Sequence, residues 1–258
     1  ALGVHVGAVA VFEADCFWLN ETHLVGRALD NRMGGFMIAE VARQLLENKD
    51  KLPFTVYLVN SVQEEIGLRG AEMISRRLQP DVAIITDVTH DTCSPLYNKK
   101  QQGDCKCGKG AVVTYGPAVQ NNLLQSIIGV AKSNEIAIQR NAVSRSTGTD
   151  TDSFAYSGMG VASALISLPL KYMHTTVEMV HRDDVENVIK LIYETLNTQI
   201  KIHKSLKKLI IKVVEFLFYK KAHIFLINFF IILFYSIDRY LSMLISLLPT
   251  FVIVLITL

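Results

Sequence analysis

Acidic and imidazole side chains that suit metal-dependent chemistry recur in this 258-residue sequence directly after its apolar runs. Each stands where such a run gives way to polar residues, a position typical of the carboxyl end of a sheet strand. One further acid is placed similarly, just before a predicted helix. In an open α/β sheet these positions lie along one edge, so we expect the side chains to meet there. The candidates are Asp30, Glu64, Glu65, Asp87 and His174.

Carboxylates and an imidazole at strand ends suit a divalent metal site, because oxygen and nitrogen ligands hold zinc, cobalt or manganese. Two ions fit if one carboxylate bridges them. Such a site produces a hydroxide near neutral pH and polarises a carbonyl, so amide hydrolysis is its natural chemistry. The reaction also needs a base. Glu64 and Glu65 are adjacent and point in different directions at a strand end, so one can bind metal while the other faces the water.

Each candidate also has a simpler interpretation. Pairs of glutamates are common on solvated surfaces, and a single histidine is more often a hydrogen-bonded structural residue than a ligand. Glu64 paired with Asp30 or Asp87 would also suit glycoside hydrolysis, which needs two carboxylates and no metal. The shared position after buried strands favours the metal site.

Strands and helices alternate over about the first 200 residues. Apolar residues recur at helical spacing over 31–47. The β-branched runs 54–62, 82–86 and 161–170 are typical of strands that are covered on both faces. This alternation predicts an α/β fold of three layers, with helices on both faces of a mostly parallel central sheet.

Composition divides the chain near residue 208. The part before it carries all 15 glycines and 44 of the 50 charged residues, as in a compact soluble domain. Residues 209–258 hold 36 apolar and six charged residues among 50. The net charge of +2 argues against a nucleic-acid partner. Four unevenly spaced cysteines favour a reduced, cytoplasmic compartment over a disulfide framework.

Five ordered motifs resemble those of one enzyme family. They are GRALDNR at 26–32, SVQEEIGLRGA at 61–71, IITDVT at 84–89, GTDTD at 148–152 and YMHTTVE at 172–178. Over roughly residues 1–200 the chain resembles the co-catalytic metallo-aminopeptidases that assemble as tetrahedral (TET) dodecamers. That family includes glutamyl and deblocking aminopeptidases and members labelled endoglucanase. Five motifs in order make a chance match very improbable.

The resemblance implies metal ligands at the matching positions. Asp30 would bridge two divalent ions, zinc or cobalt, in each subunit. Glu65 and His174 would bind one ion, and Asp87 would bind the other.

It also implies a reaction, the hydrolysis of the N-terminal bond of peptides by an oligomeric enzyme. Glu64 would act as general base, taking a proton from the attacking water and passing it to the leaving amine. Gly148, Thr149 and Asp150 would line the substrate site, although a structural turn is an equally fair interpretation.

The N-terminal part departs from the family pattern. The family has a further ligand in a His-x-Asp motif near the N-terminus, before an inserted β-domain. Neither His5 nor His23 is followed two residues later by Asp. Residues 1–19 resemble the end of the inserted domain, so we expect 20–200 to be an incomplete catalytic domain. The ion at Asp87 should then bind weakly, and activity should be low.

Residues 201–258 also depart from the family and predict an apolar helical tail. Residues 240–258 carry no charge over 19 positions, close to the ~20 that span a bilayer. Lysines before them would hold the catalytic domain in the cytoplasm. Membrane contact is therefore expected only through 222–258. Two alternatives stay open, a membrane-tethered, non-catalytic relative that binds peptides or partner subunits, and a tail that is not native protein sequence.

Overall fold

The computed structural model describes residues 4–11, 13, 15–48, 52–94, 97–198 and 252–257. The helices are α1 (Leu29–Glu47), α2 (Arg69–Leu78), α3 (Lys99–Gln102), α4 (Asn121–Ser133) and α5 (Asp150–Ala155), and residues 182–198 are also helical. The strands are β1 (Cys16–Trp18), β2 (His23–Gly26), β3 (Thr55–Asn60), β4 (Val82–His90), β5 (Ala111–Tyr115), β6 (Ile138–Ala142), β7 (Ala162–Lys171), β8 (Glu178–His181) and β9 (Val252–Thr257).

These strands form one mixed sheet in the order β1-β2-β8-β7-β4-β9-β3, with β5 pairing β7 and β6 pairing β5. The pairs around β4 are parallel, as is β5 with β6, while β1, β2 and β8 add to β7 in antiparallel fashion. The predicted α/β class is therefore confirmed, with parallel pairing at the centre of the sheet. Of the described residues within 1–19, those at 16–18 form a strand, β1.

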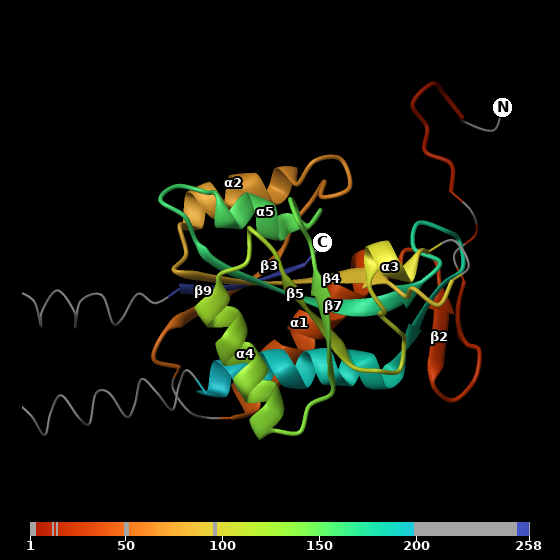
Figure 1. Ribbon diagram of the computed structural model, residues 1–258. Helices are drawn as coiled ribbons and strands as arrows, with labels where there is room; N and C mark the ends of the chain where they lie inside the picture. Colours follow the sequence, from red (N-terminus) through yellow and green to blue (C-terminus); the bar gives the residue numbers. More distant parts are fainter. Residues whose placement is uncertain are drawn as a thin grey trace, which may run out of the picture.

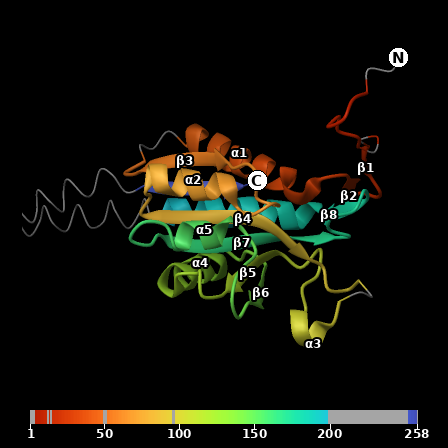
Figure 2. The ribbon, with the colours of Figure 1, turned by 90° about the horizontal axis from the view of Figure 1, so that it is seen from above.

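Helices cover both faces of the sheet (Figures 1 and 2). In Figure 1, α2 and α5 lie above it, and α1, α4 and the helix at 182–198 lie below it. The core lies around β4 and β7, whose side chains are almost all buried. Strands covered on both faces need apolar residues on both faces, which explains the continuous apolar runs in these segments.

Strand β4 extends further than the sequence predicted. Asp87 was expected to follow a strand over 82–86, but β4 continues to His90, and Asp87 pairs with Ser167 of β7 inside the sheet. Pairing with the long strand β7 keeps the chain extended past the last apolar residue. Asp87 is consequently 5% exposed.

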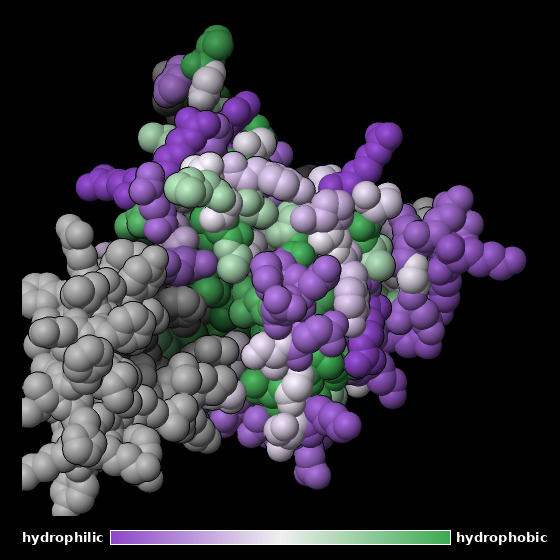
Figure 3. Space-filling model, turned by 60° about the vertical axis from the view of Figure 1, so that its left-hand side comes forward, coloured by the Kyte–Doolittle hydropathy of each residue, from purple (hydrophilic) through white to green (hydrophobic). Residues whose placement is uncertain are grey.

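Strand β3 is less covered than predicted. Val56 and Val59 are half-buried, and the other four side chains of the strand are exposed. The cause is position, because β3 ends the strand order and no described strand pairs with its outer edge. On the side of the molecule turned forward in Figure 3, apolar surface is visible between polar regions.

Strand β9 contradicts part of the predicted helical tail. Residues 252–257 lie between β3 and β4 and run parallel to both strands. The rest of the segment 201–258 lies outside the described residues. None of the helices that the structure describes is both long and apolar enough to cross a membrane.

Candidate metal centre

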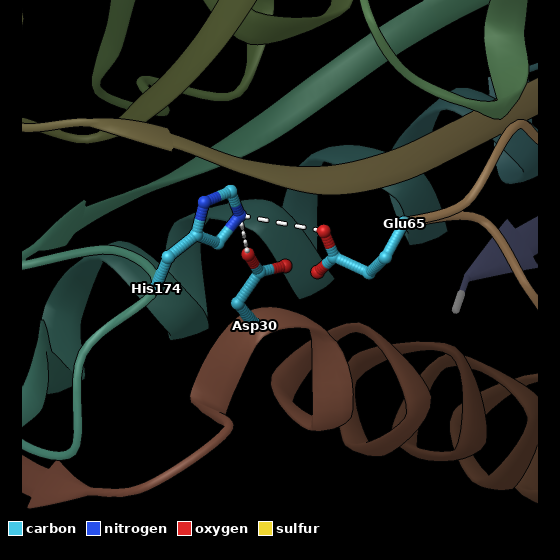
Figure 4. Close-up of side chains that lie close together, drawn as sticks. All are labelled: Asp30, Glu65 and His174. Atoms are coloured by element: carbon cyan, nitrogen blue, oxygen red, sulfur yellow. Dashed lines mark ion pairs between the residues drawn. The ribbon is translucent and has the colours of Figure 1, made fainter.

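Three of the predicted ligands lie together beside the sheet. Nε2 of His174 is 3.1 Å from Oδ2 of Asp30 and 3.4 Å from Oε2 of Glu65. One ligand atom from each residue lies within 4.8 Å of the other two. The residues come from the first turn of α1, the turn after β3 and the loop after β7, and Figure 4 shows their side chains pointing toward one another. The fold thus gathers a three-donor cluster from distant segments.

The start of α1 is fixed to the centre of the sheet. Asp30 and Asn31 have non-helical backbone angles within the first turn. The buried Asn31 side chain donates from Nδ2 to the carbonyl of Thr86, 2.9 Å away, and accepts from the backbone N–H of Gly34. This attachment holds Asp30 beside β4, next to Asp87.

Glu178, which carried no role in the sequence analysis, holds two ligand residues by their backbones. Its Oε2 accepts from the N–H of Asp30 at 3.0 Å, and its Oε1 accepts from the N–H of His174 at 2.8 Å. The side chain is 2% exposed. The available signal was an acid four residues after His174, within the motif 172–178. Its target, two backbone amides far apart in the chain, is set by the fold.

Glu64 lies beside the cluster in the turn between β3 and α2. Its carbonyl accepts from the N–H groups of Gly67 and Leu68, each 2.9 Å away, and the residue is 8% exposed. Burial raises the pKa of Glu64 to about 7, and the charges of Asp150, Glu65 and Asp30 add to the effect. A base with a pKa near neutrality accepts and returns a proton most effectively at that pH.

Asp87 lies nearby but outside the three-donor cluster. Its Oδ1 accepts from the N–H of Val88 at 2.7 Å. Burial raises its pKa well above the ordinary value, and the charges of Asp30, Glu64 and Asp150 raise it further. Asp87, Asp30, Glu64 and Asp150 therefore form an acidic group beside the metal ligands, with Asp87 on the β4 side.

The segment Gly148, Thr149 and Asp150 leads into α5. Gly148 has a positive φ of 69° and donates its N–H to Asp152, while Thr149 caps the helix by accepting from the N–H of Thr151. Asp150 is 2% exposed and accepts a hydrogen bond at Oδ2 from the Ser61 hydroxyl. The segment therefore forms a structural turn, and it also brings Asp150 close enough for its charge to act on Glu64 and Asp87.

The donor set of the cluster fits a divalent metal ion. Two carboxylates and one imidazole are typical ligands of zinc and of similar ions. Burial raises the pKa of Asp30 to about 6, and the charges of Glu65 and Glu178 raise it while His174 lowers it. The Asp30 carboxylate is thus a buried charge beside the exposed side chains of Glu65 and His174, and a cation bound by these groups would neutralise it.

Comparison with protein families gives one match over most of the chain. Residues 1–191 match the family model of M42 glutamyl aminopeptidases. The chain is 38% identical to a lysyl aminopeptidase of Pyrococcus furiosus over 190 residues, covering 74% of the chain and 53% of the relative. It is 26% identical to a glutamyl aminopeptidase of Lactococcus lactis, covering 70% of this chain and 50% of that relative. The chain therefore spans about half the length of these curated relatives.

Solved structures agree on the fold. A TET aminopeptidase from a marine-sediment Thaumarchaeota archaeon superposes with a TM-score of 0.64 at 27% identity, covering 71% of this chain and 52% of that one. A peptidase of Pyrococcus horikoshii is described as assembling into a tetrahedron or a large octahedral shell. It superposes with a TM-score of 0.58 at 30% identity, covering 71% of this chain and 53% of that one. A structure described as a putative peptidase/endoglucanase superposes with a TM-score of 0.59 at 37% identity, covering 72% of this chain and 55% of that one.

Proposed function

Because the chain belongs to the M42 glutamyl aminopeptidase family, we propose that it hydrolyses the N-terminal peptide bond of peptides in a metal-dependent reaction. One observation carries this proposal. The ligand atoms of Asp30, Glu65 and His174 lie within 4.8 Å of one another, and Glu64 is buried beside them. A carboxylate whose pKa is raised by burial, next to three possible metal ligands, is typical of a functional site.

The residues of the site divide the reaction among them. Asp30, Glu65 and His174 would hold a divalent ion, which would lower the pKa of bound water and polarise the scissile carbonyl. Glu64 accepts the proton of the attacking water and delivers it to the amine that leaves. Glu178 keeps Asp30 and His174 in place through their backbone N–H groups.

A second ion is part of the proposal. Asp30 would be shared by two ions, zinc or cobalt, and Asp87 would be a ligand of the second one. Asp87 is not among the described residues whose donor atoms cluster closely. The second ion is therefore expected to bind more weakly than the first, and hydrolysis by this chain alone is expected to be slow.

Assembly and compartment also belong to the proposal. Structures similar to this chain are described as a dodecamer and as a tetrahedral or octahedral shell. We expect this chain to form homo-oligomers of the same kind and to act on peptides in the cytoplasm.

The direct test measures hydrolysis of aminoacyl p-nitroanilides by the full chain supplied with zinc or cobalt. Activity should disappear with a chelator, return with metal, and fall at least about 100-fold in E64Q, since general-base catalysis contributes on that scale. E186Q, which changes an exposed glutamate of the helix at 182–198, is the matched control. Activity that survives both the chelator and E64Q would contradict the proposal, and chelator-resistant cleavage of glucans would favour glycoside hydrolysis.

A further inference from the structure

Asp150 carries a carboxylate oxygen with no partner. The residue is 2% exposed, and its Oδ2 is satisfied by the Ser61 hydroxyl. Its Oδ1 is buried and accepts no hydrogen bond from the residues that the structure describes. A buried acceptor left unpaired costs free energy, which marks this oxygen as one that a ligand can satisfy.

The unpaired oxygen belongs to a carboxylate of the acidic group beside the metal ligands. Among neighbouring charges, that of Asp150 raises the pKa of Glu64 the most, and it also raises the pKa of Asp87. Ser61, its hydrogen-bond partner, precedes Glu64 by three residues in the same turn. Asp150 is not part of the three-donor cluster, so a metal held by those three donors would not use it.

The chemistry of the surroundings limits what can bind there. A carboxylate oxygen only accepts hydrogen bonds, and its neighbours Glu64 and Asp87 are acids too. The group that satisfies it must therefore bring an N–H or O–H of its own, and a positive charge is favoured. The α-amino group of a peptide has a pKa of about 7.7–8.0 and is largely an ammonium at neutral pH.

We propose that Oδ1 of Asp150 accepts a hydrogen bond from the free N-terminal ammonium of a bound peptide. Asp150 is thereby the residue that distinguishes an unblocked N-terminus from a blocked one. The inference rests on the proposed function and assigns a specificity role within the same site. It also explains why the turn 148–150 is tied to the turn that carries the base.

The test measures peptide binding without metal, so that it is independent of turnover. The full chain in chelator at pH 7 is titrated with trialanine and with N-acetyl-trialanine, and affinities are read by calorimetry. The wild-type chain should bind the free-amine peptide roughly tenfold or more tightly, as charge-assisted hydrogen bonds do. D150N should reduce the ratio to within about twofold, while S61A, which keeps the carboxylate, and D104N, which changes an exposed acid, should retain it.

A second measurement on the wild-type chain covers the case in which D150N fails to fold. Trialanine with a trimethylated N-terminus keeps the positive charge but has no N–H to donate. It should bind about as weakly as the acetylated peptide. Equal binding of the trimethylated and free peptides would show general attraction of cations to the acidic group and would overturn the inference.

The remaining outcomes separate the two proposals. If D150N folds and keeps the preference for the free amine, the inference fails and the aminopeptidase proposal stands. If neither peptide binds the wild-type chain and the p-nitroanilides are not cleaved, both fail together.

Discussion

At the scale of single residues, Glu178 is the side chain on which the metal centre should depend most without touching the metal. Its two oxygens accept one backbone N–H each, from Asp30 and His174. In E178Q one oxygen becomes an amide nitrogen that cannot accept. We expect zinc affinity to fall about 10- to 100-fold, the usual cost of losing a group that orients ligands.

Equilibrium dialysis or calorimetry checks this expectation. E186Q, which changes an exposed glutamate, should bind zinc as the wild-type chain does. Unchanged affinity in a folded E178Q variant would show that the two backbone contacts do not position the ligands.

The raised pKa of Glu64 predicts how stability changes with pH in the metal-free chain. Its ordinary pKa is 4.5, and in the folded state it is about 7. The folded state therefore binds this proton more tightly, so the free energy of unfolding falls as pH rises from about 4.5 through about 7. E64Q should lose less stability than the wild-type chain over that range, by on the order of 1 kcal/mol after solvent screening.

Urea unfolding at pH 5 and pH 8 in chelator measures the difference. Burial also raises the pKa values of Asp30 and Asp150. These two groups therefore lower the free energy of unfolding of both proteins alike as pH rises. Parallel pH curves for the two proteins would show that Glu64 titrates normally in the folded chain.

The sequence predicted the candidate ligands better than it predicted the residue that positions them, Glu178. Asp30, Glu65 and His174 stand in short motifs next to strand ends, and the structure brings them together. Glu178 accepts from the backbone N–H of Asp30, which is remote in sequence, as well as from that of nearby His174. That contact depends on how the loop after β7 folds back onto the start of α1, and residue types alone do not encode it.

At the scale of elements, the turn between β3 and α2 packs closely against Gly70 in the first turn of α2. A Cβ at Gly70 would lie 2.5 Å from the backbone N of Val62 and 2.6 Å from its O, closer than real atoms approach. We expect G70A to lower the free energy of unfolding by about 1–3 kcal/mol and to weaken metal binding, because Glu64 and Glu65 lie in this turn.

Gly129 in α4 provides the matched control. A Cβ there meets nothing within 4 Å. G129A should therefore stabilise the chain by about 0.5–1 kcal/mol through helix propensity, with metal affinity unchanged. Thermal unfolding of both variants makes the comparison, and a G70A variant as stable as G129A would contradict the proposed packing.

Element types were easier to predict than element surroundings. Periodicity located α1 and the buried strands β4 and β7. The same apolar pattern predicted a covered strand at β3, which instead lies at the end of the strand order. Hydrophobic pattern reports what a strand can bury, while the neighbours that bury it are set by topology.

At the scale of the whole molecule, β9 links the two halves of the site. It pairs with β3, which leads into the turn of Glu64 and Glu65, and with β4, which carries Asp87. A proline at Leu255 would remove one N–H from a strand paired on both sides. We expect the free energy of unfolding of L255P to be lower by roughly 3 kcal/mol or more, and its metal binding to be weaker.

L255V is the control, because it keeps the N–H at the same position. Denaturant unfolding and zinc binding of both variants test the role of β9. Equal stability of L255P and L255V would show that β9 contributes nothing to the sheet.

The position of β9 also bears on how the chain folds during synthesis. β3 joins the rest of the sheet through a strand that follows it about 190 residues later in the chain. The parts that β4, β7 and β8 contribute can assemble early, whereas the β3 edge stays unpaired until the ribosome has made β9. Until then the exposed edge is a template for unwanted pairing between nascent chains. Chaperone demand and aggregation during expression should accordingly concentrate in this late interval.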